Sequence, residues 1–249
     1  MNPPLADLDV LVLAGGLGSR LAPMLGNIPK VLAPVEGRAF LDYVIDFLAR
    51  QGVRKVVLSL GHLADKVMTH IAAAKLPLRI ETVVEKRPLG TAGAIAFARA
   101  TLSSDPVLVL NGDTWLDIDL SAMRLTHREA PVPLATIACV LVDDTRRYGR
   151  IDVAPDGSIR RFVEKEDTSA TEGLVNGGAY LLSADLLDSM AANAGSSLER
   201  DVLAKLPNGT LRAHILGRAN FVDIGTPESY VHAGAFIRPQ TAGGWAGDR

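Results

Sequence analysis

The first half of the chain alternates short apolar runs with amphipathic helical patterns, and this alternation restricts the possible folds more than any other feature. Four runs rich in Val, Leu and Ile are predicted to be buried strands: Asp9–Ala14, Lys55–Leu60, Arg79–Val84 and residues 106–110. Helical patterns lie between them, at Phe40–Arg50, residues 63–74 and residues 90–102. Such an alternation predicts an α/β fold with parallel strands joined by right-handed crossovers.

The second half has a different pattern, in which strand candidates are separated mainly by turns. Strands are predicted at residues 133–142, 149–153, 159–164, 174–182, 211–216 and 220–222. Helices are predicted at residues 184–192, 197–206 and 227–237. No linker rich in Pro, Gly or Ser separates the two halves, so we expect a single domain over residues 1–249 with a flexible tail at residues 238–249.

The charge balance excludes some classes of partner. The chain has 26 Lys and Arg against 28 Asp and Glu, without the clustered basic charge typical of nucleic-acid or membrane surfaces. Its apolar runs reach about ten residues, too short to cross a bilayer, and its N-terminus has no signal-peptide pattern, so a cytoplasmic protein is expected. Cys139 is the single cysteine, and its apolar surroundings predict a buried thiol.

A glycine-rich segment follows the first predicted strand. It consists of Leu13, Ala14, Gly15, Gly16, Leu17, Gly18, Ser19 and Arg20. Glycines here allow backbone N–H groups to approach phosphates closely, although a tight turn would use the same residues. The segment is neither a P-loop nor a dinucleotide fingerprint, because it lacks Gly-Lys-Ser/Thr and has Arg20 and Leu21 where the third glycine belongs. Arg20 and Lys30 flank the loop and could together neutralise a triphosphate.

The segment from Leu13 to Val35 resembles the signature of the sugar-phosphate nucleotidyltransferase family. That signature reads Gly-Gly-x-Gly-x-Arg-Leu-x-Pro and then Pro-Lys-x-x-x-Pro-Val, and the chain matches its glycines, prolines and both cations. Later segments are similar to the family in the same order: residues 85–93, Asn111-Gly112-Asp113, Gly149, Glu164-Lys165, Asn176-Gly177-Gly178 and residues 223–227. The similarity therefore covers residues 9–237.

The resemblance implies a Rossmann-like three-layer α/β fold, with a mixed, mostly parallel central sheet flanked by helices. Residues 9–130 would form the nucleotide-binding half and residues 131–237 the sugar-phosphate-binding half. The nucleotide would contact Leu13, Ala14, Gly15, Gly16, Gly18, Ser19, Arg20, Lys30, Glu85, Leu89, Gly90, Thr91, Ala92, Asn111 and Gly112. The sugar phosphate would contact Gly149, Glu164, Lys165, Asn176, Gly177 and Gly178, with Lys165 on the phosphate. Residues 176–178 interrupt a strand with residues of poor β-propensity, which suggests close approach of a ligand to the backbone, with a β-bulge as the alternative.

Two aspartates are the candidate metal ligands. If the strand ending at Leu110 lies on the far side of the first strand, the sheet order reverses there, and ligands bind outside the carboxyl ends at such a point. Asp113 follows this apolar strand, where a stray charge would be costly, and Asp223 precedes a tight turn that opens a helix. Either could instead be a cap or turn residue. A site with only two carboxylates suits Mg²⁺, because phosphate oxygens and water complete its coordination shell. Mn²⁺ could take its place.

In the implied reaction, an oxygen of a sugar 1-phosphate attacks the α-phosphorus of a nucleoside triphosphate and pyrophosphate leaves. The second pKa of a phosphate monoester is about 6, so no general base is needed. This agrees with the histidines at positions 62, 70, 127, 214 and 232, which are interpreted as surface or loop residues. Catalysis would rest on positioning and on charge supplied by Arg20, Lys30, Asp113, Lys165 and Asp223.

The choice of substrates is ranked from the resemblance. Residues 88–93 look most like guanylyltransferases, so GTP with D-glycero-D-manno-heptose 1-phosphate comes first and GTP with mannose 1-phosphate second. A uridylyl- or thymidylyltransferase acting on a hexose or N-acetylmuramate 1-phosphate is third. An inactive subunit that senses nucleotide sugars is disfavoured, because Arg20, Lys30 and both aspartates are present. The sequence leaves open whether the chain forms a homo-oligomer.

Overall fold

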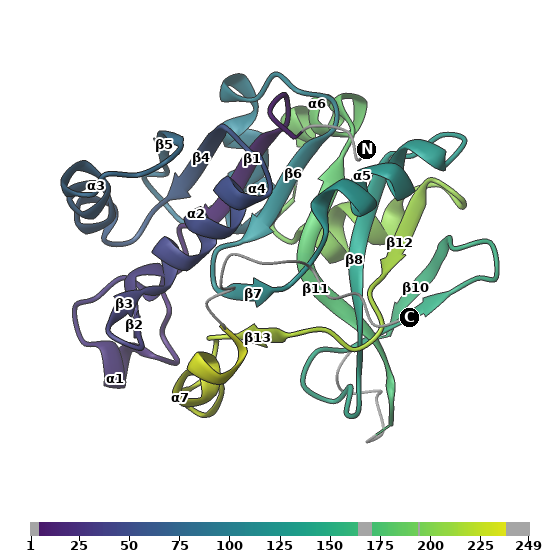
Figure 1. Cartoon of the computed structure of the whole chain (residues 1–249). Coiled ribbons are helices and arrows are strands. Elements are labelled where there is room, and N and C mark those ends of the chain that lie inside the picture. Colours follow the sequence, from purple (N-terminus) through teal and green to yellow (C-terminus); the bar gives the residue numbers. More distant parts are fainter. Residues whose placement is uncertain (1–4, 164–170, 194, 238–249) are drawn as a thin grey trace.

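A seven-stranded sheet lies at the centre of the computed structural model, which describes residues 5–163, 171–193 and 195–237 (Figure 1). The strands follow the order β12-β8-β11-β6-β1-β4-β5. Their bounds are β1 Asp9–Ala14, β4 Lys55–Leu60, β5 Arg79–Val84, β6 Val107–Asn111, β8 Ala135–Val142, β11 Gly173–Leu182 and β12 Leu211–Ile215. All of them run in one direction except β11, which is antiparallel to β6 and β8. The expected mixed, mostly parallel sheet is confirmed.

Helices cover both faces of the sheet because alternate strand residues enter two separate hydrophobic clusters. In β1, Val10 and Val12 belong to one cluster and Leu11 to the other. The first cluster includes residues of α2 Phe40–Arg50, α3 Ala64–Ala73, α5 Leu120–Glu129 and α7 Pro227–Phe236. The second includes residues of α4 Gly90–Ala98 and α6 Ala184–Asn193. The three-layer arrangement follows from this alternation.

Shorter strands and helical turns lie outside the central sheet. They are α1 Ala22–Leu25, β2 Pro34–Val35, β3 Arg38–Ala39, β7 Thr114–Leu116, β9 Arg150–Val153, β10 Ile159–Val163 and β13 Phe221–Asp223, with the short helical turns η1 Lys30–Leu32, η2 Arg99–Thr101, η4 Leu198–Val202 and η5 Leu203–Lys205. The pairs β2–β3, β7–β13 and β9–β10 are antiparallel ladders. Within the described ranges, no helix is long and apolar enough to span a membrane.

Most of the elements expected in the first half are present in the structure. The bounds of β1, β4, β5 and α2 are confirmed, and Cys139 is buried, as predicted. The helix expected over residues 90–102 ends at Ala98 and continues as a 3₁₀ turn. The interpretation of all histidines as surface or loop residues is wrong for His127, which is 4% exposed in α5 and hydrogen-bonded to Thr136. The tail at residues 238–249 lies outside the described ranges.

Candidate active site

A cavity of about 470 Å³ opens outside the carboxyl ends of β1 and β6. β6 pairs with β1 on the side opposite to β4, so the strand order reverses between these two strands, as expected. The predicted nucleotide contacts that line the cavity are Leu13, Ala14, Gly15, Gly16, Gly18, Ser19, Lys30, Glu85, Gly90, Thr91 and Asn111. Asp113 lines it as well, together with Leu17, Val31, Ser59, Pro88 and Ala94.

Three predicted nucleotide contacts have structural roles beside the cavity rather than a place in its wall. The Gly112 N–H donates to the Leu13 carbonyl, and a Cβ at Gly112 would lie 2.5 Å from that oxygen. Ala92 is fully buried in the second hydrophobic cluster. The Leu89 N–H donates to Glu85. Close packing of β1 against β6 and of α4 against the sheet therefore explains Gly112 and Ala92 without a ligand, whereas Leu89 takes part through its backbone N–H.

The start of α4 is fixed by the segment before η4. A Cβ at Gly90, which has φ +72°, would lie 2.2 Å from the Ser196 carbonyl oxygen. The Ala92 N–H donates to the same carbonyl, and the Leu198 N–H donates to the Thr91 hydroxyl. Glycine is thus required at position 90 by contact with another backbone segment. These bonds join the nucleotide cavity to the second half of the chain.

Of the residues that the structure describes, Glu85 and Asp113 are the two acidic side chains that line the cavity. Glu85 follows the edge strand β5, whereas Asp113 follows β6, on the other side of β1. Its carboxylate accepts a hydrogen bond from the Leu89 N–H and packs against Gly15 and Gly61, where any Cβ would approach it within about 3 Å. Desolvation by burial raises the pKa of the Glu85 carboxyl above its ordinary value. Among the described residues, only Leu89 donates to it. The carboxylate is therefore placed to accept hydrogen bonds from a bound group.

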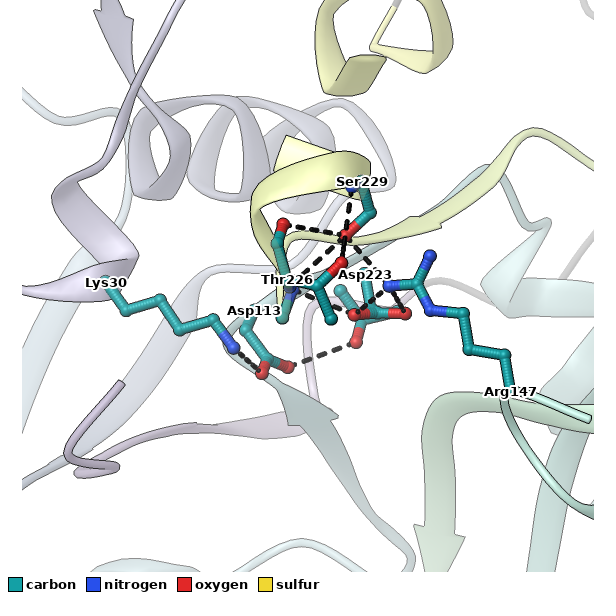
Figure 2. A network of polar contacts seen from close by, with 8 residues as sticks. Lys30, Asp113, Arg147, Asp223, Thr226 and Ser229 are labelled. Carbon is teal, nitrogen blue, oxygen red and sulfur yellow. Dashed lines mark hydrogen bonds and ion pairs between the residues drawn. The ribbon is translucent and has the colours of Figure 1, made fainter. Parts of the chain in front are cut away.

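Asp113 and Asp223 are brought together by the β7–β13 ladder. Asp223 is the register partner of Thr114, and the Ile224 N–H donates to the Asp113 carbonyl at 2.8 Å. The turn after β13 is closed by the Gly225 N–H, which donates to Asp223, and Thr226 caps α7. Figure 2 shows the two carboxylates lying close together in one network. The sequence did not predict this ladder, which is the feature that joins the two candidate metal ligands.

Each carboxylate of this acid pair is bound by its own cation. Lys30 Nζ lies 2.5 Å from Asp113, and Arg147 Nη2 lies 2.9 Å from each carboxylate oxygen of Asp223. The two cations approach from opposite sides (Figure 2). Arg20 is exposed and reaches the turn after Asp223, since its Nη2 lies 3.4 Å from the place of a Gly225 Cβ. The structure thus gathers four of the five predicted catalytic side chains, those of Arg20, Lys30, Asp113 and Asp223, around one point.

The donor chemistry of the acid pair fits Mg²⁺. Two carboxylates offer hard oxygen ligands, and magnesium completes its shell with phosphate oxygens and water. No group of three or more His, Cys, Asp and Glu residues that could hold a metal occurs within the described ranges, so these residues do not form an all-protein metal cage. Cations already neutralise both carboxylates, and a divalent ion could replace them there.

A second cavity, of about 550 Å³, lies beside the break in β11. Of the predicted sugar-phosphate contacts, Gly149 and Asn176 line it, while Glu164 and Lys165 lie outside the described ranges. Gly177 and Gly178 form the register shift between β11 and β8 and pack against neighbouring side chains and backbone. The β-bulge therefore accounts for these two glycines.

One wall of this second cavity carries a polar network that the sequence analysis missed. The Tyr180 hydroxyl donates to Glu199 at 2.6 Å, and the Asn176 amide donates to both the Tyr180 hydroxyl and Glu199. Tyr180 is fully buried, which raises its pKa. Glu199 and Arg200 of η4 also line the cavity. Only the three-dimensional packing of η4 against β11 identifies them, because the Leu-Glu-Arg-Asp run looks like an ordinary solvated helix.

Arg147 and Tyr148 were also missed. They lie in the loop between β8 and β9, directly before Gly149. The Tyr148 ring packs against Phe221 in a tilted arrangement with centroids 5.1 Å apart. Burial, followed by the nearby Asp223 carboxylate, raises the pKa of Tyr148 to about 12. Two adjacent arginines in a polar loop give no signal in the sequence that separates a site residue from a surface charge.

Comparisons with known proteins agree with this geometry. The chain is 33% identical to D-glycero-alpha-D-manno-heptose 1-phosphate guanylyltransferase of Campylobacter jejuni, over 90% of this chain and 98% of that one. It is 31% identical to mannose-1-phosphate guanylyltransferase of Mycobacterium tuberculosis, over 92% of this chain but 64% of that one. The crystal structure of HddC from Yersinia pseudotuberculosis matches with a TM-score of 0.81 and 33% identity, over 93% of this chain and 100% of that one. The family model described as Nucleotidyl transferase matches residues 9–240, and the chain belongs to this family.

Proposed function

We propose that the chain transfers the guanylyl group of GTP to a sugar 1-phosphate, with D-glycero-D-manno-heptose 1-phosphate as the favoured acceptor. The observation that carries this proposal is the position of the acid pair. Asp113 lines the first cavity, and Asp223 is bound by Arg147, which directly precedes two residues lining the second. A nucleotide in the first cavity and a sugar phosphate in the second would meet at the two carboxylates.

The first cavity favours guanine at its Glu85 end. Guanine presents two adjacent donors, N1–H and the 2-amino group, which one carboxylate can accept together. Adenine presents an acceptor beside its amino group, and uracil and thymine present a single ring N–H, so each would leave a polar group near Glu85 poorly paired. The crystal structure of HddC complexed with GMP-PN supports the same choice of base.

The reaction needs charge compensation more than proton transfer. A phosphate monoester is largely ionised at neutral pH, because its second pKa is about 6, so its oxygen can attack the α-phosphorus directly. Lys30 and Arg20 would stabilise the departing pyrophosphate, and Lys165 would bind the attacking phosphate. Bound at Asp113 and Asp223, Mg²⁺, or Mn²⁺ in its place, would supply positive charge to the phosphates. The positions of Lys30 and Arg20 beside the acid pair support their roles. The role of Lys165 rests on the resemblance alone, because Lys165 lies outside the described ranges.

The sugar is ranked by the relatives. The heptose 1-phosphate guanylyltransferase of C. jejuni is matched over nearly all of its length, whereas the chain spans 64% of the mannose-1-phosphate guanylyltransferase of M. tuberculosis. Mannose 1-phosphate is therefore the second candidate acceptor. A cytoplasmic location and a homo-oligomer stay predictions.

A substrate panel tests the proposal. The purified chain would be incubated with GTP, ATP, UTP or dTTP and with heptose, mannose, glucose or N-acetylmuramate 1-phosphate in MgCl₂, and pyrophosphate release would be followed. We expect turnover only when both substrates are present, with the highest kcat/KM for GTP and the heptose phosphate. Preference for UTP or dTTP would contradict the guanylyl assignment, and no turnover with any pair would favour an inactive sensor of nucleotide sugars.

A further inference from the structure

Arg147 holds Asp223 with a single nitrogen of its guanidinium. Nη2 donates to both carboxylate oxygens, at 2.9 Å each, and to the Ser229 hydroxyl at 2.8 Å. Its Nε and Nη1 donate to no other residue in the described part of the chain, and the side chain is 38% exposed. The two-nitrogen face of the guanidinium, which suits phosphate oxygens, is therefore not used to bind Asp223.

A metal ion at Asp223 would have to displace this contact. The same two oxygens that would coordinate the ion are both occupied by Nη2, and a guanidinium and a divalent cation repel one another at such short range. Arg147 lies in a loop; in the described ranges its side chain donates hydrogen bonds only to Asp223 and Ser229, lies over the Tyr148 ring and feels the charge of Glu228. It can move away from Asp223 without breaking the β7–β13 ladder, whose backbone bonds are independent of it.

Arg147 directly precedes one wall of the second cavity. Tyr148 and Gly149, the two residues after Arg147, both line that cavity, and Arg150 follows them in the same wall. Figure 2 shows Arg147 entering from the side opposite to Lys30, which serves the nucleotide cavity. A phosphate that extends from the second cavity toward the acid pair would pass beside this guanidinium.

We propose that Arg147 is a ligand of the acceptor phosphate, and that it serves as the counter-ion of Asp223 until a metal ion takes its place. The inference rests on the proposed function, since it assigns a further residue to the sugar 1-phosphate. Asp113 and Asp223 would be neutralised by the bound ion in place of their present cations, and the released Arg147 guanidinium would then face the incoming phosphate dianion. Arg147 then acts on the acceptor side as Lys30 acts on the nucleotide side.

Two measurements on Arg147→Ala test the proposal. Titration of the nucleotide-free protein with MnCl₂, followed by the electron paramagnetic resonance of free Mn²⁺, should show binding that is roughly two- to tenfold tighter than in the wild type, because no exposed ion pair has to be broken. Steady-state kinetics should show a KM for mannose 1-phosphate or heptose 1-phosphate that is about ten- to a hundredfold higher, the effect of one charge-assisted hydrogen bond, with an unchanged KM for GTP. Arg147→Lys should recover part of the acceptor affinity.

Arg146 provides the matched control, because it lies in the same loop and pairs with exposed Asp144 instead. Arg146→Ala should leave Mn²⁺ affinity and both KM values unchanged, and circular dichroism should show that each variant is folded. If Arg147→Ala bound Mn²⁺ more weakly and kept a normal KM for the sugar phosphate, Arg147 would only position Asp223 and the proposal would be wrong. The Mn²⁺ titration needs no turnover, so its result stands even if the wild type proves inactive and the proposed function itself fails.

Discussion

Asp223 is the register partner of Thr114, the residue that directly follows Asp113, in the antiparallel ladder of β7 and β13. Backbone hydrogen bonds, including that from the Ile224 N–H to the Asp113 carbonyl, therefore set the spacing of the two carboxylates. Side chains of the same shape should keep this spacing when their charge is removed. The acid pair can thus be tested without disturbing the frame that holds it.

Asp113→Asn and Asp223→Asn should each lower kcat by about 10²–10³-fold, the usual cost of removing one electrostatic group from a reacting centre. Each change removes one carboxylate from the expected metal site. A chelator should abolish wild-type turnover, and MgCl₂ or MnCl₂ should restore it. Kinetic assays with and without the chelator provide the measurement.

Asp188→Asn is a suitable control for the acid pair, because Asp188 forms an exposed ion pair with Arg99 and neither residue lines the two cavities. It should retain full activity. A variant of Asp113 or Asp223 with wild-type kcat and an unchanged metal requirement would remove that aspartate from the site.

Glu85→Gln should reduce the kcat/KM for GTP by about 10- to 100-fold, because one charged acceptor facing two guanine donors is worth 1.5–3 kcal/mol. Inosine triphosphate lacks the 2-amino group, so the wild type should prefer GTP to it, and Glu85→Gln should lose most of that preference. Parallel kinetics with the two triphosphates measure the coupling. An undiminished preference for GTP in the variant would show that another group reads the base.

Arg20 and Lys165 should divide the two phosphate-binding tasks. Arg20 follows the glycine-rich loop and reaches the turn at Gly225, so Arg20→Ala should weaken GTP binding in a direct titration, by about 10-fold or more. Lys165→Ala should instead raise the KM for the sugar 1-phosphate and leave GTP binding unchanged. A Lys165 that only forms a surface pair with Glu164 would give neither effect, and weak GTP binding with a normal sugar-phosphate KM would reverse the assignment.

Periodicity and local motifs were sufficient to predict most of the fold. The apolar runs of β1, β4 and β5 are a clear signal in the sequence, because strands of a parallel sheet that is covered on both faces need apolar residues. The apolar face of α2 is a clear signal because a helix that packs on a sheet needs one apolar face. The strand that ends near Leu110 was placed on the far side of β1 as a condition, which the pairing of β6 with β1 confirms; the expected ligand site then followed from the rule that ligands bind where the strand order reverses. The cavity at that point is lined by most of the glycine-rich loop; that the loop binds a nucleotide stays a prediction.

Contacts between distant segments were the part that the sequence could not predict. Thr114–Leu116 is too short to show a strand period, so β7 and its pairing with β13 were missed. The pairing of Arg147 with Asp223 spans 76 positions, and nothing local distinguishes Arg147 from Arg146. Helix α5 was missed although Asp119 caps it, because its apolar residues are interrupted by Arg124 and His127, which the fold buries.

His127 gives the last prediction, which concerns stability rather than catalysis. Desolvation by burial lowers the pKa of His127 from 6.5 to about 4, against the opposing charge of Asp105. The unfolded chain therefore binds more protons than the folded chain between these two pH values, and the free energy of unfolding must fall as the pH drops through this window. The lost stability is roughly 3 kcal/mol once the pH is below both values.

His127→Asn removes the titration and keeps a polar group near the Thr136 hydroxyl, which bonds to Nδ1 in the wild type. Urea unfolding at several pH values between 4 and 7 should show a shallower loss of stability in this variant. The matched His232→Asn should keep the wild-type slope, because His232 is exposed on α7. His214, whose pKa burial also lowers, should leave a residual slope in His127→Asn. Identical slopes in His127→Asn and the wild type would mean that His127 is not held neutral by the fold, and the pH dependence would then have to come from other groups.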